Sequence, residues 1–587
     1  MTTDYESLRT ENRARYGWDT AHIELLGSLY SERTHFIFEL IQNAEDANAT
    51  TLAFDLHGDR LEVRHNGRPF TDEDVTSLCQ VAHSSKAGDL TKIGKFGIGF
   101  KSVYAYTRSP HVYSGDESFR IEKYVQPHAV PARDVPGGDT LFSFPFDRDD
   151  VPAERAVAEI AQALAKLSPE VLLFLKKIEQ LTINLPRVPA FALDRIEDAG
   201  PTRSSRQILI SDSRVADGPD VEWLVWRRAV SDDDHLGQQV EIAFRYKAPG
   251  TQQDARYELA SLNRSPLVAF FPTAKETGLG FLIQGSYRTT PSRDNVPEHD
   301  EWNRKLVTAT SALLTEVLSE LRDDGLLTVD VLQALPIDSD RFPEDGMFRP
   351  LFEAVLACIK NRHFIPLYGG GFGKAAETRL ARGTRLRELL APDILGRLYG
   401  AETQLSFAHE SITADRTPDL WYYLRDQASV EEVTPEGVLL RTTREFLTVQ
   451  PDEWIARFYE FLLDNPALSR AARYGGERPG IARTKPVIRL EDGRHVVPFR
   501  GNGQPAAYLP GTIETEFPTV RRAIAANGAH QISQPEPGRV GDRVSRVDQA
   551  PLLGGRRYPG TGWRWSKAWT RYGNHLVIGD VHLHVED

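Results

Sequence analysis

Residues that suit phosphate binding form one glycine-spaced turn, Gly94-Lys95-Phe96-Gly97-Ile98-Gly99-Phe100. Glycines let the backbone approach phosphate oxygens closely, and a helix expected to begin near Phe100 would present free amide N–H groups at its start. A GxxGxG turn alone is a weak signal, because most glycine turns between elements bind nothing. The surrounding elements therefore decide whether phosphate is the ligand.

The helical segment HFIFELIQNAEDANA precedes this turn. Glu39, Asn43 and Asp46 lie at positions i, i+4 and i+7, which places three polar groups on one face and leaves an apolar face for the core. A polar stripe of this kind normally faces solvent. For the helix taken alone, that interpretation stays open.

Further elements must hold the helix and the glycine turn together. The alternating runs Thr51–Leu56 and Arg60–His65 predict a β-hairpin, which is followed by Asn66-Gly67. A polar stretch then leads to the glycine turn, and strands are expected near residues 111–113, 119–124 and 140–146. This order predicts one α+β unit ending near residue 150, and behind such a helix and hairpin the glycine turn becomes a strong phosphate signal.

These motifs resemble the GHKL ATPase superfamily, which includes gyrase, the ninety-kilodalton heat-shock chaperone and histidine kinases. ELIQNAEDA (residues 39–47) looks like the first sequence box, HNG (residues 65–67) the second, the glycine turn the third, and Thr140 a candidate for the fourth. The amino-acid sequences of these boxes are most similar to those of sacsin-type ATPases. The resemblance covers about the first 150 residues and implies a Bergerat-type α/β sandwich that binds ATP and Mg²⁺.

The resemblance also implies roles for single residues. Asn43 would bind Mg²⁺ through its side-chain oxygen, Glu39 would orient or deprotonate the attacking water, and Asp46 would support the nucleotide pocket. Nucleotide contacts are implied for a larger set: His65, Asn66, Gly67, Ser85, Lys86, Gly94, Phe96, Gly97, Ile98, Gly99, Phe100, Lys101 and Thr140. For Lys86 and Lys101 the alternative is an ordinary surface lysine.

His65 departs from the family pattern, which has an aspartate that accepts a hydrogen bond from the adenine amino group. A neutral imidazole accepts such a bond only through its unprotonated nitrogen, so adenine recognition is expected to weaken as the pH falls through about 6.5. In the alternatives, Asn66 or Asp72 takes over this contact, or the pocket holds nucleotide loosely.

The segment Thr71–Ile93 corresponds to the nucleotide lid of the family, and its Ser84, Ser85 and Gly88 suit a hinged polar loop that folds over ATP. A plain surface loop is the alternative. Cys79 lies in this segment without a basic neighbour arranged to activate it. We therefore expect Cys79 to be a small buried residue and not a nucleophile.

Residues 151–335 are expected to form linker helices and an α/β middle domain. Its strands are predicted near residues 207–210, 222–227, 239–244, 267–271 and 280–284, and its helix near residues 302–321. In the heat-shock relatives an arginine of this domain reaches the terminal phosphate of ATP. Arg293 in the run PSRDN is our candidate for that catalytic role, with an ordinary solvated turn arginine as the alternative.

The rest of the chain carries weaker signals. Residues 336–527 are predicted to be mostly helical, without a fold that the sequence names, and residues 528–587 to be poorly ordered because they are rich in Gly, Arg and Pro. GGGFGKA at residues 369–375 lacks two positions of a Walker loop. His582 and His584 have no further ligand for a metal.

Length, composition and net charge limit the classes of protein to which this chain can belong. At 587 residues the chain is long enough for two or three domains, and no apolar run approaches the ~20 residues of a membrane helix. A polar N-terminus and two cysteines fit the cytoplasm better than a secreted disulfide framework. The net charge of −13 makes nucleic acid an unfavourable partner.

The sequence thus predicts an ATP-driven conformational machine. ATP would close the lid and bring two copies together in a nucleotide-dependent homodimer, and the output would be chaperone-like remodelling of a protein client or a bacterial defence role. The rival interpretation is a non-catalytic, nucleotide-gated scaffold or sensor. DNA topology or repair would need a DNA-binding surface, which the acidic balance disfavours.

Overall fold

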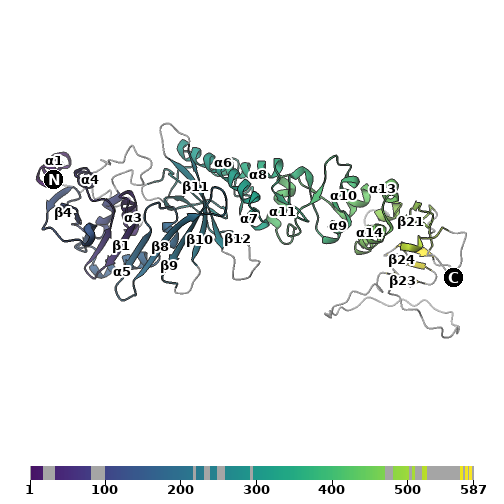
Figure 1. Cartoon of the computed structure of the whole chain (residues 1–587), viewed down its shortest axis with the longest axis horizontal. Helices are drawn as coiled ribbons and strands as arrows, with labels where there is room; N and C mark the ends of the chain where they lie inside the picture. The colour runs from purple at the N-terminus through teal and green to yellow at the C-terminus, as the bar shows by residue number, and fades with distance from the viewer. Residues whose placement is uncertain are drawn as a thin grey trace. The chain divides into compact units, whose positions relative to one another are not determined.

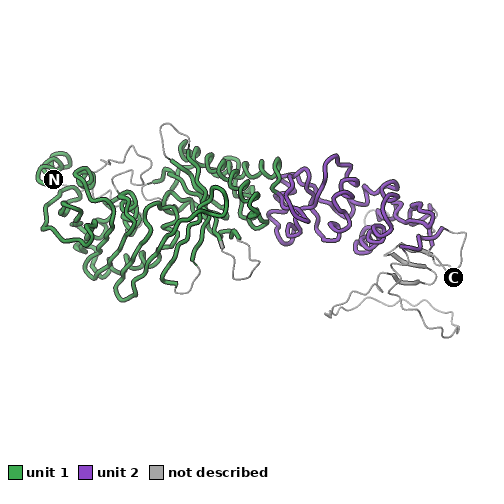
Figure 2. The backbone as a smooth tube through the Cα atoms, viewed as in Figure 1, with its two compact units in different colours: residues 1–364 green, residues 365–587 purple. Residues whose placement is uncertain are grey.

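The computed structural model describes these parts of the chain: residues 2–17, 33–80, 99–215, 220–230, 238–247, 258–290, 295–469, 480–501, 505–508 and 518–524, and the strands at 569–572, 575–578 and 581–584. The chain forms two compact units, residues 1–364 and residues 365–587 (Figure 2). No helix among the described residues is both long enough and apolar enough to cross a membrane.

One sheet of 15 strands runs through the first unit, in the order β14-β13-β15-β11-β10-β9-β8-β7-β1-β2-β6-β3-β4-β5, with β12 paired to β11 (Figure 1). Its N-terminal strands are β1 (Thr51–Leu56), β2 (Arg60–His65), β3 (His111–Ser114), β4 (Glu117–Glu122), β5 (Gln126–Ala129) and β6 (Thr140–Pro145). The others are β7 (Gln180–Asn184), β8 (Phe191–Ala199), β9 (Arg206–Asp212), β10 (Val221–Ala229), β11 (Gln239–Lys247), β12 (Glu258–Ala260), β13 (Pro266–Ala269), β14 (Phe271–Glu276) and β15 (Leu282–Gly285).

The predicted hairpin is confirmed, because β1 and β2 have the expected bounds and pair antiparallel. Its register places His65 opposite Leu52, and on the other side of β2 the same residue lies opposite Thr140 of β6. Directly opposed residues of an antiparallel pair point to the same face of the sheet. The second and fourth boxes therefore share one face.

The two halves of the first unit are continuous. Strand β1 pairs in parallel with β7, with Leu52 opposite Leu181, and the hydrophobic core extends from Leu8 to Leu282. A middle domain separate from residue 151 onward was expected, whereas the structure extends one sheet and one core across that boundary. A pairing between strands so far apart in sequence leaves no local pattern, so the expected boundary at residue 150 has no structural counterpart.

The helices of the first unit include the one that carries the first box. They are α1 (Tyr5–Tyr16), η1 (Arg33–His35), α3 (Phe36–Asp46), α4 (Asp72–Cys79), η2 (Gly99–Ala105), η3 (Pro136–Gly138), α5 (Ala153–Ala165), η4 (Pro169–Leu172), α6 (Glu301–Asp323), α7 (Val329–Ala334) and α8 (Arg349–Asn361). The start of the predicted lid loop is helical, which corrects the expectation. Thr71 and Asp74 form a capping box that begins α4.

The second unit is built mainly of short helices, in agreement with the sequence. They are η5 (Ala375–Glu377), α9 (Thr384–Leu389), α10 (Pro392–Tyr399), α11 (Pro418–Tyr422), the π-helical turn η6 (Tyr423–Gln427), α12 (Pro435–Arg441), α13 (Arg444–Thr448), α14 (Asp452–Asp464), η7 (Pro466–Leu468) and η8 (Ile481–Thr484). Small sheets accompany them: β16 (Ile365–Pro366) with β17 (Phe372–Gly373), β18 (Thr378–Leu380) with β19 (Ser406–Phe407) and β20 (Glu431–Glu432), and β21 (Ile488–Arg489) with β22 (His495–Val496). Together with the first unit, this mixture of helices and sheets agrees with the predicted α+β class.

The C-terminal segment contains regular structure that the sequence analysis missed. Strands β23 (Trp569–Tyr572), β24 (His575–Ile578) and β25 (Val581–His584) form an antiparallel sheet. The expectation of a poorly ordered tail is therefore wrong for these residues. The signal was present in HLVIGDVHLH, where two apolar-rich runs flank a Gly-Asp pair typical of hairpin turns.

Candidate nucleotide site

Glu39, in the first half of α3, contacts the last glycine of the glycine turn. A β-carbon added to Gly99 would lie 1.9 Å from Glu39 Oε2 and 2.6 Å from its Cδ. Glycine is therefore the residue type that fits at position 99, because any side chain there would collide with the carboxylate. Glu39 is only 9% exposed, and the solvent-facing interpretation is wrong for this residue. The structure thus brings the first and third sequence boxes together.

The Glu39 carboxylate has few protein partners. His35 Nε2 lies 3.4 Å from Glu39 Oε1, and no hydrogen bond to the carboxylate is found within the described part of the chain. Asn43, one turn later, is half-buried, and its amide likewise has no side-chain hydrogen bond to a described residue. As far as the described residues show, both side chains keep hydrogen-bonding capacity, and the Asn43 oxygen is the hard donor that Mg²⁺ prefers.

Other ligands for a metal ion are absent from the described ranges, which hold no group of three or more His, Cys, Asp or Glu side chains suited to a metal. A protein-only metal centre is therefore not formed by these residues. A single amide oxygen fits a magnesium ion that retains water and phosphate oxygens as its remaining ligands.

Glu45, at the opposite end of α3, has the reverse environment. Its carboxylate accepts hydrogen bonds from the backbone N–H groups of Lys176 (2.7 Å), Lys177 (3.0 and 3.2 Å) and Ile178 (3.0 Å). These residues directly precede β7, so Glu45 joins the helix of the first box to the parallel strand pair. Sequence analysis gave Glu45 no role, because its partners lie more than 130 residues away.

His65 is buried and neutral. Its exposure is 3%, burial lowers the pKa of His65 to about 4, and Nδ1 accepts the backbone N–H of Gly67 at 3.1 Å. The neutral ring must then carry its proton on Nε2, which makes that nitrogen a donor. The expected loss of adenine recognition near pH 6.5 is corrected by this environment, since His65 does not titrate there.

Neighbouring candidates have their polar groups engaged in structural bonds. Asn66 Oδ1 accepts the backbone N–H groups of Thr50 (2.8 Å) and Thr51 (3.0 Å), which ties the hairpin end to the segment after α3. At Gly67 a β-carbon would lie 2.8 Å from the Ala47 carbonyl oxygen, so glycine permits this close packing. The exposed Asn66 amide thus holds the backbone in place, and it gains no support as the replacement for an aspartate.

Thr140 of the fourth box is buried, whereas Asp46 lies in a more exposed, charged environment. Thr140 is fully buried, and its hydroxyl lies 2.5 Å from the Ser114 hydroxyl. Asp46 is half-buried and raises the pKa of Arg68, although the largest cause of that rise is the hydrogen bond of Arg68 to Asp74. Arg68 and Asp74 form a two-pronged ion pair at 2.6 and 2.9 Å, so the start of α4 is anchored beside the site.

Lys101 is a buried structural residue, which corrects the surface alternative. It is 1% exposed, and its ammonium group donates to the Leu78 carbonyl at 2.6 Å and to the Tyr124 carbonyl. Burial lowers the pKa of Lys101 to about 8. In this structure the ammonium group is therefore engaged inside the protein, between the end of α4 and the β4–β5 turn, and is not offered to a phosphate.

The neighbours of Lys101 are also core residues. Phe100 packs with its ring 5.9 Å from that of Phe142, and Cys79 is fully buried, which raises the pKa of its thiol to about 12. The prediction that Cys79 is a small buried residue is confirmed. Asn12 is a further structural residue that sequence analysis missed. Its side-chain amide donates to the carbonyls of Cys79 (3.0 Å) and Val125 (2.8 Å).

Several predicted site residues lie outside the described residues: Ser85, Lys86, Gly94, Phe96, Gly97, Ile98 and Arg293. The segments flanking Arg293 are described. The buried Asn303 at the start of α6 accepts the Arg288 N–H (2.7 Å) and donates to the carbonyls of Arg288 and Pro297 (3.0 Å each). One side chain thus fixes the backbone on both sides of the predicted arginine.

Comparisons with known proteins give one domain match and similar proteins. Residues 55–135 match the Sacsin domain. The protein NO VEIN of Arabidopsis thaliana is 26% identical over an alignment of 383 residues that covers 58% of this chain and 13% of NO VEIN. Sacsin of Homo sapiens is 24% identical over an alignment of 431 residues that covers 54% of this chain and 9% of sacsin. These similarities agree with the sacsin-type resemblance of the sequence boxes.

The chain covers only a small share of the length of both relatives, 13% and 9%. Among solved structures, the N-terminal domain of a DNA repair protein aligns with 51% of this chain and 98% of its own, at 12% identity and a TM-score of 0.29. A likeness at that TM-score does not assign the fold.

Proposed function

We propose that this protein binds Mg-ATP at the site formed by Glu39, Asn43 and the glycine turn, and hydrolyses it as an ATPase of the GHKL type. The observation that supports this proposal most directly is the contact of the Glu39 carboxylate with Gly99. The match of residues 55–135 to the Sacsin domain supports it independently.

Glu39 is the general base of the proposed reaction. Its carboxylate accepts no hydrogen bond from the described residues, so an attacking water can donate to it. The water would lose its proton to Glu39 as its oxygen bonds to the terminal phosphorus, while the bond from that phosphorus to the bridging oxygen breaks and ADP leaves. Such general-base assistance is usually worth about 10² to 10⁴ in rate. When bound through Asn43, Mg²⁺ supplies charge neutralisation for the phosphates.

The proposed output is a nucleotide-driven change of conformation. ATP would close the segment after α4, bring two copies together and recruit Arg293 toward the terminal phosphate, for chaperone-like remodelling of a protein client or for bacterial defence. The single continuous sheet supports coupling between the site and the middle strands, because β1 pairs directly with β7.

Titration calorimetry with Mg-ATP and Mg-GTP tests nucleotide binding. In Gly99→Ala the new methyl group would collide with Glu39, and we expect the affinity for ATP to fall at least tenfold. Gly58→Ala is the matched control, because a β-carbon at Gly58 meets nothing within 4 Å. Absence of ATP binding to the wild type, or unchanged binding in Gly99→Ala, would overturn the proposal.

Phosphate release separates the two functional classes. A wild-type protein that binds Mg-ATP and releases phosphate is an ATPase. A protein that binds ATP without releasing phosphate over many hours is the nucleotide-gated scaffold or sensor.

A further inference from the structure

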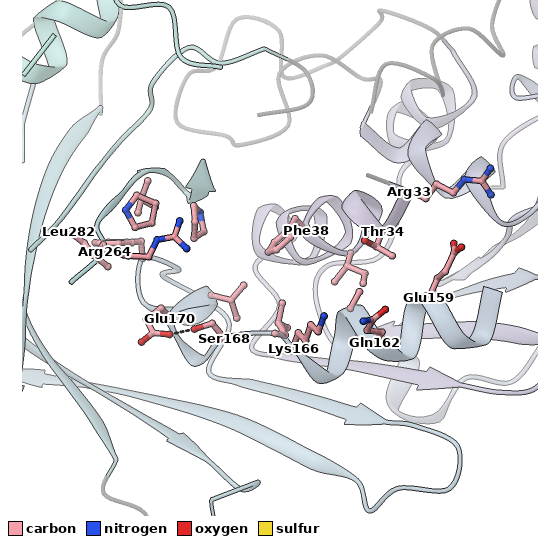
Figure 3. A pocket seen from close by; sticks show the side chains of 18 of the residues that line it. Arg33, Thr34, Phe38, Glu159, Gln162, Lys166, Ser168, Glu170, Arg264 and Leu282 are labelled. Atoms are coloured by element: carbon pink, nitrogen blue, oxygen red, sulfur yellow. Dashed lines mark hydrogen bonds between the residues drawn. The ribbon is translucent and has the colours of Figure 1, made fainter. Parts of the chain in front are cut away.

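The first unit contains a cavity of about 820 Å³ that the proposed ATPase does not use. Its walls come from three parts of the chain: η1 and the start of α3, the segment from α5 to η4, and the strands β10, β13, β14 and β15. Volumes of this size are typical of small-molecule sites. Figure 3 shows labelled side chains from these walls arranged around the hollow.

The cavity has an apolar lining. Ile37, Val171, Phe174, Trp223 and Val268 line it and are each 1–3% exposed, so their side chains form a fixed wall. The more exposed apolar side chains of the lining, such as Phe38 and Ala163, are the surface that a ligand would remove from water, at about 25 cal/mol for each Å². The cavity therefore favours a molecule with an apolar body.

The polar groups of the cavity favour an anionic head group. Lys166 lines it and forms no ion pair within the described part of the chain, and Gln162 lies one helical turn before it on α5. Arg264, an exposed side chain, also lines the cavity (Figure 3) and pairs with Glu276 at 2.5 Å. Lys166, Gln162 and Arg264 thus offer hydrogen-bond donors to the cavity.

The two carboxylates of the lining are already engaged. Glu159 accepts hydrogen bonds from Arg155 (2.7 Å) and Tyr106 (2.8 Å), and the Arg155 bond lowers the pKa of Glu159. Glu170 accepts a hydrogen bond from Ser168. The lining holds three cations, Arg33, Lys166 and Arg264, against these two carboxylates, and Lys166 pairs with neither of them, so the net positive charge of the lining disfavours a cationic ligand.

We infer that this cavity binds a small amphipathic anion, with its head group at Lys166 and Gln162 and its apolar body against Ile37 and Val268. Neutral apolar molecules fit the same wall but lack the ion pair. An ion pair with the exposed Lys166 side chain is worth about two- to fivefold in affinity.

Two fluorescent probes that differ only in charge test this inference. 1-Anilinonaphthalene-8-sulfonate carries a sulfonate, and N-phenyl-1-naphthylamine has the same rings without it. We expect the full-length protein to bind the sulfonate about two- to fivefold more tightly. In Lys166→Gln that preference should disappear while the affinity for the neutral probe stays the same.

Control variants locate the site. Lys360→Gln removes an exposed cation of α8 that does not line the cavity, and it should leave both affinities unchanged. Ala163→Phe fills the cavity from α5 and should weaken both probes at least fivefold. Equal binding of the two probes to the wild type, or a charge preference that survives Lys166→Gln, would overturn the inference. Because Lys166 is an exposed side chain, its substitution keeps the test valid even if Ala163→Phe fails to fold.

Discussion

Glu39 and Glu45 belong to the same helix and are equally buried, each 9% exposed, yet their carboxylates have opposite surroundings. Glu45 accepts four backbone contacts from residues 176–178, whereas Glu39 contacts Gly99 and accepts no hydrogen bond from the described residues. Burial and residue type are the same at both positions. What separates them is whether the protein itself supplies the hydrogen-bond donors, and this predicts which glutamate stabilises the fold and which can act on a ligand.

The largest expected effect is the loss of ATP turnover when Glu39 is substituted. Glu39→Gln keeps the shape of the side chain but removes the base, so phosphate release should fall by about 10²- to 10⁴-fold. The free energy of unfolding should change by less than ~1 kcal/mol, because the carboxylate accepts no hydrogen bond from the described residues. A steady-state phosphate assay and a urea titration measure the two effects; a large stability loss with normal turnover per folded molecule would reverse the assignment.

Substitution of Glu45, in the last turn of α3, should show the opposite result. Glu45→Gln places an amide against the N–H groups of Lys176, Lys177 and Ile178, and at least one of them loses its acceptor. Charged hydrogen bonds of this kind are worth ~2–4 kcal/mol when broken in a buried site. The urea midpoint should therefore fall, while kcat of the molecules that remain folded stays within about twofold of the wild type.

The difference between these two glutamates marks what could be predicted from sequence. Local patterns gave the hairpin with its bounds, the helix of the first box and the burial of Cys79, because periodicity and residue type determine them. The role of Glu45 and the parallel pair of β1 with β7 depend on partners more than 100 residues distant, which no local pattern contains. Lys101 was misjudged for a related reason, since its buried partners are two carbonyl groups that have no sequence signature.

His65 resembles Glu45, because its Nδ1 atom already accepts a hydrogen bond from the protein backbone. The folded-state pKa of His65 is about 4 and its ordinary value is 6.5. Above pH 6.5 the ring is neutral in both states, and below pH 4 it is protonated in both. Between these values the unfolded chain binds more protons, so the contribution of His65 to stability is lost as the pH falls from 6.5 to 4, by at most ~3 kcal/mol.

His65→Asn tests this assignment, because its side-chain oxygen can replace Nδ1 as the acceptor for the Gly67 N–H. The pH dependence of the urea midpoint between pH 4 and 6.5 should be shallower in this variant than in the wild type. The affinity of the wild type for ATP should stay constant between pH 8 and 6. A tenfold weakening over that range would contradict this assignment. It would show that His65 titrates at its ordinary pKa and contacts the base through the ring nitrogen that gains the proton.

The smallest expected effect concerns a third face of the same helix. Ile37 and Phe38 of α3 line the cavity, while Glu39 of the same helix contacts Gly99. A ligand that packs on Ile37 and Phe38 holds the helix in the position that Glu39 needs, so saturation with 1-anilinonaphthalene-8-sulfonate should tighten ATP binding by about two- to tenfold. Coupling of binding is reciprocal, and ATP must then tighten binding of the probe by the same factor. Calorimetry in both orders measures the two factors: unequal factors would point to a competing site, and two factors of one would mean that α3 keeps its two faces independent.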